Sequence, residues 1–193
     1  MNKILLLGTM ILAIFAFGGY KAMAGNTQNP SSVDFANKKI LIAYYSYSGN
    51  TKHVAEAIQA EVNGNLFEIK TDASYPEDGG KMIEQAKTEI KNNYRPRLSN
   101  FVHNIEQYDI IFLGSPIWWG TITPQVSSFL DNYNLSGKIV IPFITHGGSD
   151  AVDAIAAMTN QCKGCQVIQD GWSGYGDRTL GLSNWLKDLG YKK

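Results

Sequence analysis

The stretch IAYYSYSGNTKHVAEAI, which runs from Ile42 to Ile58, decides the fold of this chain. It begins inside an apolar run from Ile40 to Tyr45, which has the length and composition of a strand buried on both faces. A polar turn follows, and then Val54, Ile58 and Val62 recur at helical spacing. Strand, short loop and amphipathic helix together predict the first β-α unit of a parallel sheet.

The loop of this unit has the features of a phosphate-binding nest. Backbone N–H groups at the end of a strand and the start of a helix converge on one anion-sized position. The hydroxyls of Ser46, Ser48 and Thr51 can add hydrogen bonds, and Gly49 lets the backbone turn closely. The alternative is an ordinary Ser/Thr helix cap, which any β-α connection can use. The loop lacks the glycine patterns of nucleoside triphosphate and Rossmann dinucleotide sites, which argues against both ligands.

The stretch from Ile42 to Ala55 resembles the FMN phosphate signature of the flavodoxin family, and the similarity extends over residues 39–190. The resemblance implies an α/β fold, a doubly wound five-stranded parallel sheet with helices on both faces and strand order 2-1-3-4-5. It also implies FMN as the cofactor. The residues that would hold the monophosphate are Ser46, Tyr47, Ser48, Gly49, Asn50 and Thr51.

The rest of the chain repeats the alternation of strand and helix. Apolar runs predict further strands at Leu66 to Ile69, Ile110 to Leu113, Ile139 to Ile144 and Gln166 to Ile168. Helix-period segments lie around residues 79–92, 126–133, 152–158 and 185–189. Strands and helices in this order form a parallel sheet with right-handed crossovers. In such sheets the ligand binds beyond the carboxyl ends of the strands. Pro142 lies within the fourth strand, where we expect a bulge because proline has no N–H to donate.

Two adjacent tryptophans follow the third strand, in a loop bounded by proline and glycine. Aromatic rings at a pocket mouth commonly contact a ligand, and an indole suits a planar isoalloxazine ring. The alternative is that both rings fold back on the protein's own surface. The resemblance implies that the flavin ring is flanked by Pro116, Ile117, Trp118, Trp119, Gly120 and Thr121. Because neighbouring side chains diverge, we expect only one of the two indoles to stack.

The loop after the fourth strand is predicted to reach the polar edge of the ring. It contains Thr145, His146, Gly147 and Gly148, and its two glycines allow backbone amides to face a ligand. The alternative is a simple glycine turn. Flavodoxins often place a tyrosine here to cover the second flavin face, and His146 is the nearest equivalent. We therefore expect that face to be open, which favours direct contact with a substrate or another redox group.

The first 24 residues have the pattern of a cleaved signal peptide. Lys3 precedes an apolar run from Ile4 to Phe17, and Ala22-Met23-Ala24 matches the small-residue rule for cleavage. The alternative, a membrane anchor, needs about 20 apolar residues. Residues 25–38 are polar and turn-prone, which predicts a flexible leader before a domain at 39–193. The sequence thus predicts an exported protein, periplasmic or secreted, without a stable membrane anchor.

The charge balance bears on the partners. Of the 193 residues 18% are charged, and removal of the signal segment leaves a net charge of about −2. No basic run suits nucleic acid. Flavodoxins with cytoplasmic partners are typically more acidic and use that field to steer association, so those partners are not expected here. The sequence leaves the oligomeric state open.

Three functions are compatible with these features, and the third of them is a binding protein that has lost its redox use. The first is a one-electron carrier that serves a redox protein or a small electron acceptor. The second is an FMN-dependent NAD(P)H oxidoreductase that acts on quinones or nitro compounds. The chain has no second nucleotide-binding loop, and dinucleotides are scarce outside the cytoplasm, which favours the carrier. We predict no catalytic residue and no metal site.

Cys162 and Cys165 are the two cysteines of the chain, and export would place them in an oxidising compartment. We therefore predict a structural disulfide. Redox activity is the competing interpretation, because Cys-x-x-Cys pairs can be catalytic. The pair lies at the amino end of the fifth strand, whereas the flavin lies beyond the carboxyl ends. A strand spans roughly 17–20 Å, which favours the structural role.

Overall fold

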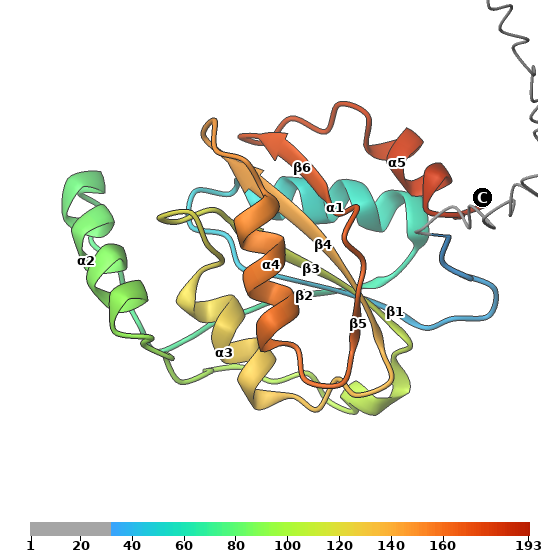
Figure 1. Ribbon diagram of the computed structural model, residues 1–193, viewed down its shortest axis with the longest axis horizontal. Coiled ribbons are helices and arrows are strands. Elements are labelled where there is room, and N and C mark those ends of the chain that lie inside the picture. The colour runs from blue at the N-terminus through green and yellow to red at the C-terminus, as the bar shows by residue number, and fades with distance from the viewer. Residues whose placement is uncertain (1–31) are drawn as a thin grey trace, which may run out of the picture. The chain divides into compact units, whose positions relative to one another are not determined.

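The computed structural model describes residues 32–193, and Figure 1 shows a twisted sheet with helices around it. Five strands run parallel in the order β2-β1-β3-β4-β5, and β6 also pairs with β4, so the predicted class and strand order are confirmed. The strands are β1 (Ile40–Tyr44), β2 (Asn65–Glu68), β3 (Ile110–Pro116), β4 (Ile139–His146), β5 (Gln166–Val167) and β6 (Trp172–Tyr175). The helices are α1 (Asn50–Val62), α2 (Gly79–Lys91), α3 (Pro124–Asn132), α4 (Val152–Gln161) and α5 (Leu182–Asp188), and a short 3-10 helix, η1, spans Ile105–Gln107.

Helices cover both faces of the sheet, and the residues of β1 show how. All five residues of β1 are buried. Leu41 belongs to the same apolar cluster as Phe129 of α3, which lies on one face. The next residue, Ile42, packs in a second cluster with Ile58 of α1 and Leu186 of α5 on the other face. Because consecutive strand residues point to opposite faces, a strand covered on both sides needs an uninterrupted apolar run.

The edge beyond β4 differs from the single fifth strand that the sequence predicts. β5 pairs with the start of β4 and β6 pairs with its end, and Pro142 lies opposite the interruption between them. Val140 O accepts a hydrogen bond from Ile168 N, so the alternate position 142 turns its nitrogen to the same side. Pairing with β3 continues through Pro142 without a break, so the expected bulge is wrong. The proline is tolerated because its nitrogen faces a gap between two strands.

The domain begins earlier than the predicted boundary at residue 39. Val33 is buried, and its N–H donates to Leu189 O at 2.7 Å. The ring of Phe35 lies 5.3 Å from that of Tyr191, measured between centroids. Residues 33–38 therefore pack with the domain, which corrects that part of the predicted leader at 25–38. The predicted signal peptide at 1–24 and the leader up to residue 31 lie outside the described residues.

Within residues 32–193, no helix combines the length and the hydropathy that crossing a membrane requires. Cys162 and Cys165 are joined by a disulfide with a Cα–Cα distance of 5.8 Å. Cys162 is the C-cap of α4 and Cys165 directly precedes β5. The bond therefore lies at the amino end of the fifth strand, away from the carboxyl edge where the predicted ligand loops emerge.

Candidate functional site

A cavity of ≈ 410 Å³ lies at the carboxyl ends of β1, β3 and β4. Three of the predicted loops, α2 and the end of β6 line it through Tyr47, Ser48, Asn50, Thr51, Met82, Pro116, Ile117, Trp118, Thr145, His146, Gly147, Tyr175 and Gly176. The predicted residues that do not line the cavity are Ser46, Gly49, Trp119, Gly120, Thr121 and Gly148. The structure thus brings together the three predicted loops and adds side chains that the sequence analysis did not select.

The loop at residues 46–51 enters α1 through Gly49, whose φ of 91° lies in the left-handed region that glycine adopts without strain. Gly49 is the N-cap of α1, and no side chain caps the N–H groups of the first turn. Those groups and the helix dipole are therefore available to an anion. Ser46 Oγ is buried and has no hydrogen-bond partner within residues 32–193. Since a buried polar atom normally has a partner, an oxygen of a bound phosphate fits this position.

Thr145 connects the end of β4 to the phosphate loop. Its Oγ1 lies 2.9 Å from Oγ1 of Thr51, and both side chains are buried. One hydroxyl donates to the other, which leaves the second hydroxyl hydrogen for another acceptor. The two loops therefore share a polar contact at the floor of the cavity.

Trp118 lines the cavity and is surrounded by three tyrosines. The ring centroids of Tyr45, Tyr47 and Tyr75 lie 5.7, 6.0 and 5.1 Å from that of Trp118, and all three rings are close to perpendicular to it. Edge-to-face contacts of this kind fix the orientation of the indole. Burial raises the pKa of Tyr45 and of Tyr75 well above the usual value, so this aromatic wall is uncharged at neutral pH.

Trp119 points away from the cavity. Its Nε1–H donates to Ile83 O on α2 at 3.1 Å, and Lys87 Nζ lies 4.6 Å from the centroid of its ring. The two indoles therefore diverge as expected. The geometry of Trp118 suits stacking on a planar ligand, whereas Trp119 folds back on the protein's own surface.

The lining of the cavity contains an aromatic ring that the sequence analysis missed. Tyr175, at the end of β6, lies edge-on to His146 with ring centroids 6.2 Å apart. His146 Nδ1 accepts a hydrogen bond from Gly148 N at 3.0 Å, and His146 O accepts one from Gly176 N at 2.9 Å. Tyr175 therefore adds an aromatic ring beside His146, the residue that the sequence analysis placed at the second flavin face. The aromatic residue between two glycines, Gly174 and Gly176, was the available signal, but no strand was predicted there.

Met82 is the other missed lining residue. It lies on α2, which the sequence analysis predicted as a helix but did not connect with the site. No local pattern marks this methionine, because its position over the cavity depends on where α2 lies relative to the sheet. The contacts that hold α2 are therefore part of the site.

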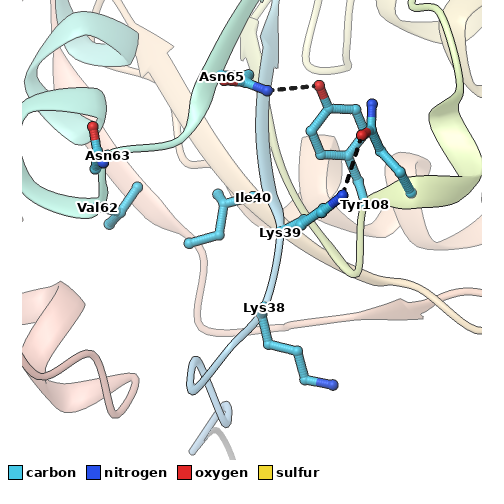
Figure 2. Close-up of a pocket in the computed structure, with 8 residues that line it drawn as sticks. Lys38, Lys39, Ile40, Val62, Asn63, Asn65 and Tyr108 are labelled. Carbon is cyan, nitrogen blue, oxygen red and sulfur yellow. Dashed lines mark hydrogen bonds between the residues drawn. The ribbon is translucent and has the colours of Figure 1, made fainter.

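A second cavity, of ≈ 390 Å³, lies at the opposite edge of the sheet, between the start of β1 and the end of α1. Figure 2 shows Lys38 and Lys39 extending in different directions, and Lys39 Nζ donates to Gln107 Oε1 at 3.5 Å. Lys38 is paired with Asp109 at 3.9 Å. The two lysines of this cavity are thus bonded to residues of the chain itself and do not converge on one point. Parallel α/β sheets also bind their ligands at the carboxyl ends of the strands, whereas this cavity lies at the amino end of β1. Among residues 32–193, no cluster of His, Cys, Asp or Glu could hold a metal ion.

The fold agrees with comparisons to known proteins. A profile of the flavodoxin family matches residues 39–188. A flavoprotein structure from Bacteroides eggerthii superposes with a TM-score of 0.71 at 29% identity, over 81% of this chain and 100% of that one. A flavoprotein from Lactobacillus acidophilus, solved in complex with FMN, gives a TM-score of 0.64 at 29% identity, over 77% of this chain and 98% of that one.

Curated relatives add a different activity. An NAD(P)H dehydrogenase (quinone) from Cupriavidus metallidurans is 29% identical over 126 residues, which is 58% of this chain and 61% of that protein. A protein of the same name from Paraburkholderia phymatum is 28% identical over 126 residues, or 58% of this chain and 60% of the relative. The chain thus spans about three fifths of the length of these relatives.

Proposed function

The chain belongs to the flavodoxin family, and on this premise we propose that it is an exported electron-transfer protein with FMN in the cavity at the carboxyl edge. The observation that carries the proposal is the loop at residues 46–51. It combines the left-handed Gly49, the uncapped first turn of α1 and the buried hydroxyl of Ser46, which has no partner within residues 32–193. These three features suit one terminal phosphate.

The remaining walls suit the flavin ring. Trp118 offers an indole face on one side, and His146 with Tyr175 offers aromatic surface on the other. Bound FMN supplies the capacity to accept and donate electrons singly or in pairs. The protein's residues hold the phosphate, orient the ring and exclude water from its aromatic faces. Because a tyrosine carries no positive charge in either protonation state, the tyrosines around Trp118 add none that would favour an anionic ring.

The second candidate is an FMN-dependent NAD(P)H oxidoreductase acting on quinones or nitro compounds, and the names of the curated relatives favour it. Against it, only the loop at residues 46–51, among those described in 32–193, combines a left-handed glycine cap, an uncapped first turn and a buried hydroxyl without a partner, so a dinucleotide has no evident second anchor for its pyrophosphate. Without such an anchor, hydride transfer loses the rate advantage that positioning provides. We therefore favour the carrier.

The pattern of residues 1–24 supports export, and a periplasmic or secreted location is part of the proposal. The partner would then be a redox protein or a small electron acceptor of the same compartment. The almost balanced charge of the chain gives little long-range steering, so contact at the cavity mouth would select the partner.

The test uses the mature protein loaded with FMN under anaerobic conditions. Mixing with NADH or NADPH should bleach the oxidised flavin band slowly or not at all, whereas dithionite should bleach it fully. Complete bleaching by NADH or NADPH within seconds, without added reductase, would assign the chain to the oxidoreductases. Failure to bind FMN more tightly than riboflavin would contradict the cofactor assignment itself.

A further inference from the structure

The helix α2 is weakly attached to the rest of the domain. Among its residues only Ala86 is buried, although α2 has thirteen residues. Figure 1 shows α2 standing beside the sheet, away from the layers formed by α1, α3, α4 and α5. A helix that buries so little apolar surface gains little from tertiary packing, so a few specific contacts decide its position.

The C-terminal half of α2 has its own anchor. Tyr75 donates a hydrogen bond to Glu89, and Gln85 Nε2 donates to Ser74 O at 3.1 Å. Ala86 is buried in the same half. The N-terminal half, which carries the cavity-lining Met82, relies on a different set of contacts.

Asp78 caps the first turn of that half, and Trp119 contacts the helix at Ile83 and, one turn later, at Lys87. Trp119 makes these contacts from a backbone conformation that disfavours tryptophan. Trp118 and Thr121 exchange two backbone hydrogen bonds, at 3.0 and 3.1 Å, around a two-residue turn. Trp119 and Gly120 have φ values of 50° and 77°, as in the type I′ turns that prefer Asn or Gly at the first position. A tryptophan in the left-handed region costs free energy, and such strain points to a role for the side chain. That side chain bonds Ile83 O and stacks under Lys87.

The first residues of α2 have a composition that packing does not explain. A Cβ on Gly79 would meet no atom within 4 Å, and one on Gly80 would meet only Asp78 Oδ1, at 3.3 Å. Neither glycine has a positive φ. Two glycines at the start of a helix therefore weaken it without a steric reason. The Asp78 side chain caps this turn by accepting from Gly80 N and Lys81 N, and the two glycines give its backbone more freedom than other residues would.

The space between α2 and the tryptophan loop also suits movement. A groove of ≈ 180 Å³ separates them, lined by Met82, Ile83, Ala86, Ile117, Trp118 and Trp119. It shares Met82, Ile117 and Trp118 with the cofactor cavity. Packing between α2 and the tryptophan loop is thus incomplete, and the groove between them is continuous with the wall of the cofactor cavity.

We propose that Trp119 is a positioning residue that latches the N-terminal half of α2 over the cofactor cavity, with Gly79 and Gly80 as the flexible joint. Closed, this half places Met82 in the cavity wall; released, it opens a path to the ring. The inference rests on the proposed function only in taking the cavity as the FMN site. The left-handed conformation of Trp119 costs free energy, and the contacts of its side chain with Ile83 and Lys87 on α2 offset that cost.

The first test needs no cofactor. Hydrogen exchange of the α2 amides is compared in the wild type, Trp119→Asn and Trp119→Phe. Trp119→Asn removes both contacts and relaxes the turn, so exchange at residues 83–87 should quicken about tenfold while the stability of the whole domain stays equal or rises. Trp119→Phe, which retains a ring over Lys87, should show a smaller effect. Gly79→Ala should slow exchange, and Phe101→Asn, at another exposed aromatic residue, should leave α2 unchanged.

The second test measures FMN kinetics. A released latch should raise both the association and the dissociation rates of FMN several-fold in Trp119→Asn, with a smaller change in the dissociation constant. Unchanged exchange in α2, or exchange that quickens equally throughout the domain, would overturn the latch. If the wild type binds no FMN, the proposed function fails, but the exchange comparison still decides whether Trp119 holds α2.

Discussion

The hydroxyls of Thr51 and Thr145 lie 2.9 Å apart, although the two residues are 94 positions apart in the sequence. Thr51 is in the first turn of α1, and Thr145 is near the carboxyl end of β4. The bond joins the loop that suits a phosphate to the strand whose following loop closes the cavity. The position of the loop at residues 46–51 thus depends on that of the loop after β4.

Replacing one of these threonines by valine should cost more than replacing both. Thr51→Val alone leaves the Thr145 hydroxyl buried without its partner, at a cost of about 1–3 kcal/mol, while the double variant removes both polar groups. Urea unfolding of the two single variants and the double variant measures the coupling. Additive losses would show that the contact does not contribute to stability.

Ser46→Ala should affect the cofactor-free protein and the FMN complex in opposite ways. The Ser46 hydroxyl is buried without a partner among the described residues, so its removal should not lower the free energy of unfolding. FMN affinity should fall by about 1.5–3 kcal/mol, the value of a charge-assisted hydrogen bond. Riboflavin, which lacks the phosphate, serves as the control and should bind equally to both proteins. An equal loss for both ligands would place Ser46 outside the phosphate site.

Trp118→Ala should weaken FMN binding by about 1–3 kcal/mol, the range for stacking on a planar ring. Trp119→Ala should change the dissociation constant less, because that indole faces α2. Titration followed by flavin fluorescence gives both constants. Trp118→Phe separates stacking from cavity formation, since it retains an aromatic face. Equal effects of the two alanine variants would contradict the assignment of the stacking ring.

Reduction of the Cys162–Cys165 disulfide should lower the free energy of unfolding. The loss should be only about 2 kcal/mol, because the stabilisation grows with the length of the closed loop and this loop is very short. The flavin should still be reduced by dithionite as before, since the bond lies at the opposite end of the sheet. Urea unfolding with and without dithiothreitol, alongside Cys162→Ser/Cys165→Ser, checks the first statement. A changed flavin reduction potential in that variant would indicate a redox role for the pair.

Stability should fall as the pH rises above about 10. Burial, followed by the charges of Glu68 and Glu56, raises the pKa of Tyr44 to about 12. The unfolded chain therefore releases this proton first, between pH 10 and 12, and each pH unit costs the folded state about 1.4 kcal/mol. Tyr44→Phe should flatten this part of the profile, which urea unfolding at several alkaline pH values can measure. An identical slope in both proteins would exclude Tyr44 as a source.

The first β-α unit and the loop that suits a phosphate could be predicted from the sequence because both are encoded locally, whereas the strand order, which is also correct, was implied by the resemblance to the flavodoxin family. Residues 40–62 contain a strand, a turn and a helix in direct succession, and each has its own periodicity or glycine. The same loop supplies backbone N–H groups and hydroxyls from consecutive positions. The walls of the cavity are different, because they come from segments that meet only after the sheet has formed.

The aromatic walls show that limit clearly. The sequence predicted that Trp118 and Trp119 diverge, but only the position of α2 decides that Trp119 turns outward. Tyr175 reaches the cavity because the fifth strand is interrupted opposite Pro142 and β6 resumes the pairing. Pro142 itself was misread, since a strand's tolerance for proline depends on which neighbour its nitrogen faces.

The sequence by itself determined the alternation of strands and helices and the loop that suits a phosphate, and its resemblance to the flavodoxin family supplied the order of the strands. Tertiary structure alone decided which indole lines the cavity, which residues form the second wall, and that Met82 belongs to the site. The physical reason is range: strand and helix periodicity and turn chemistry act over a few residues. The packing of α2 and the register of β6 depend on contacts between segments that are distant in the chain, which no local pattern records.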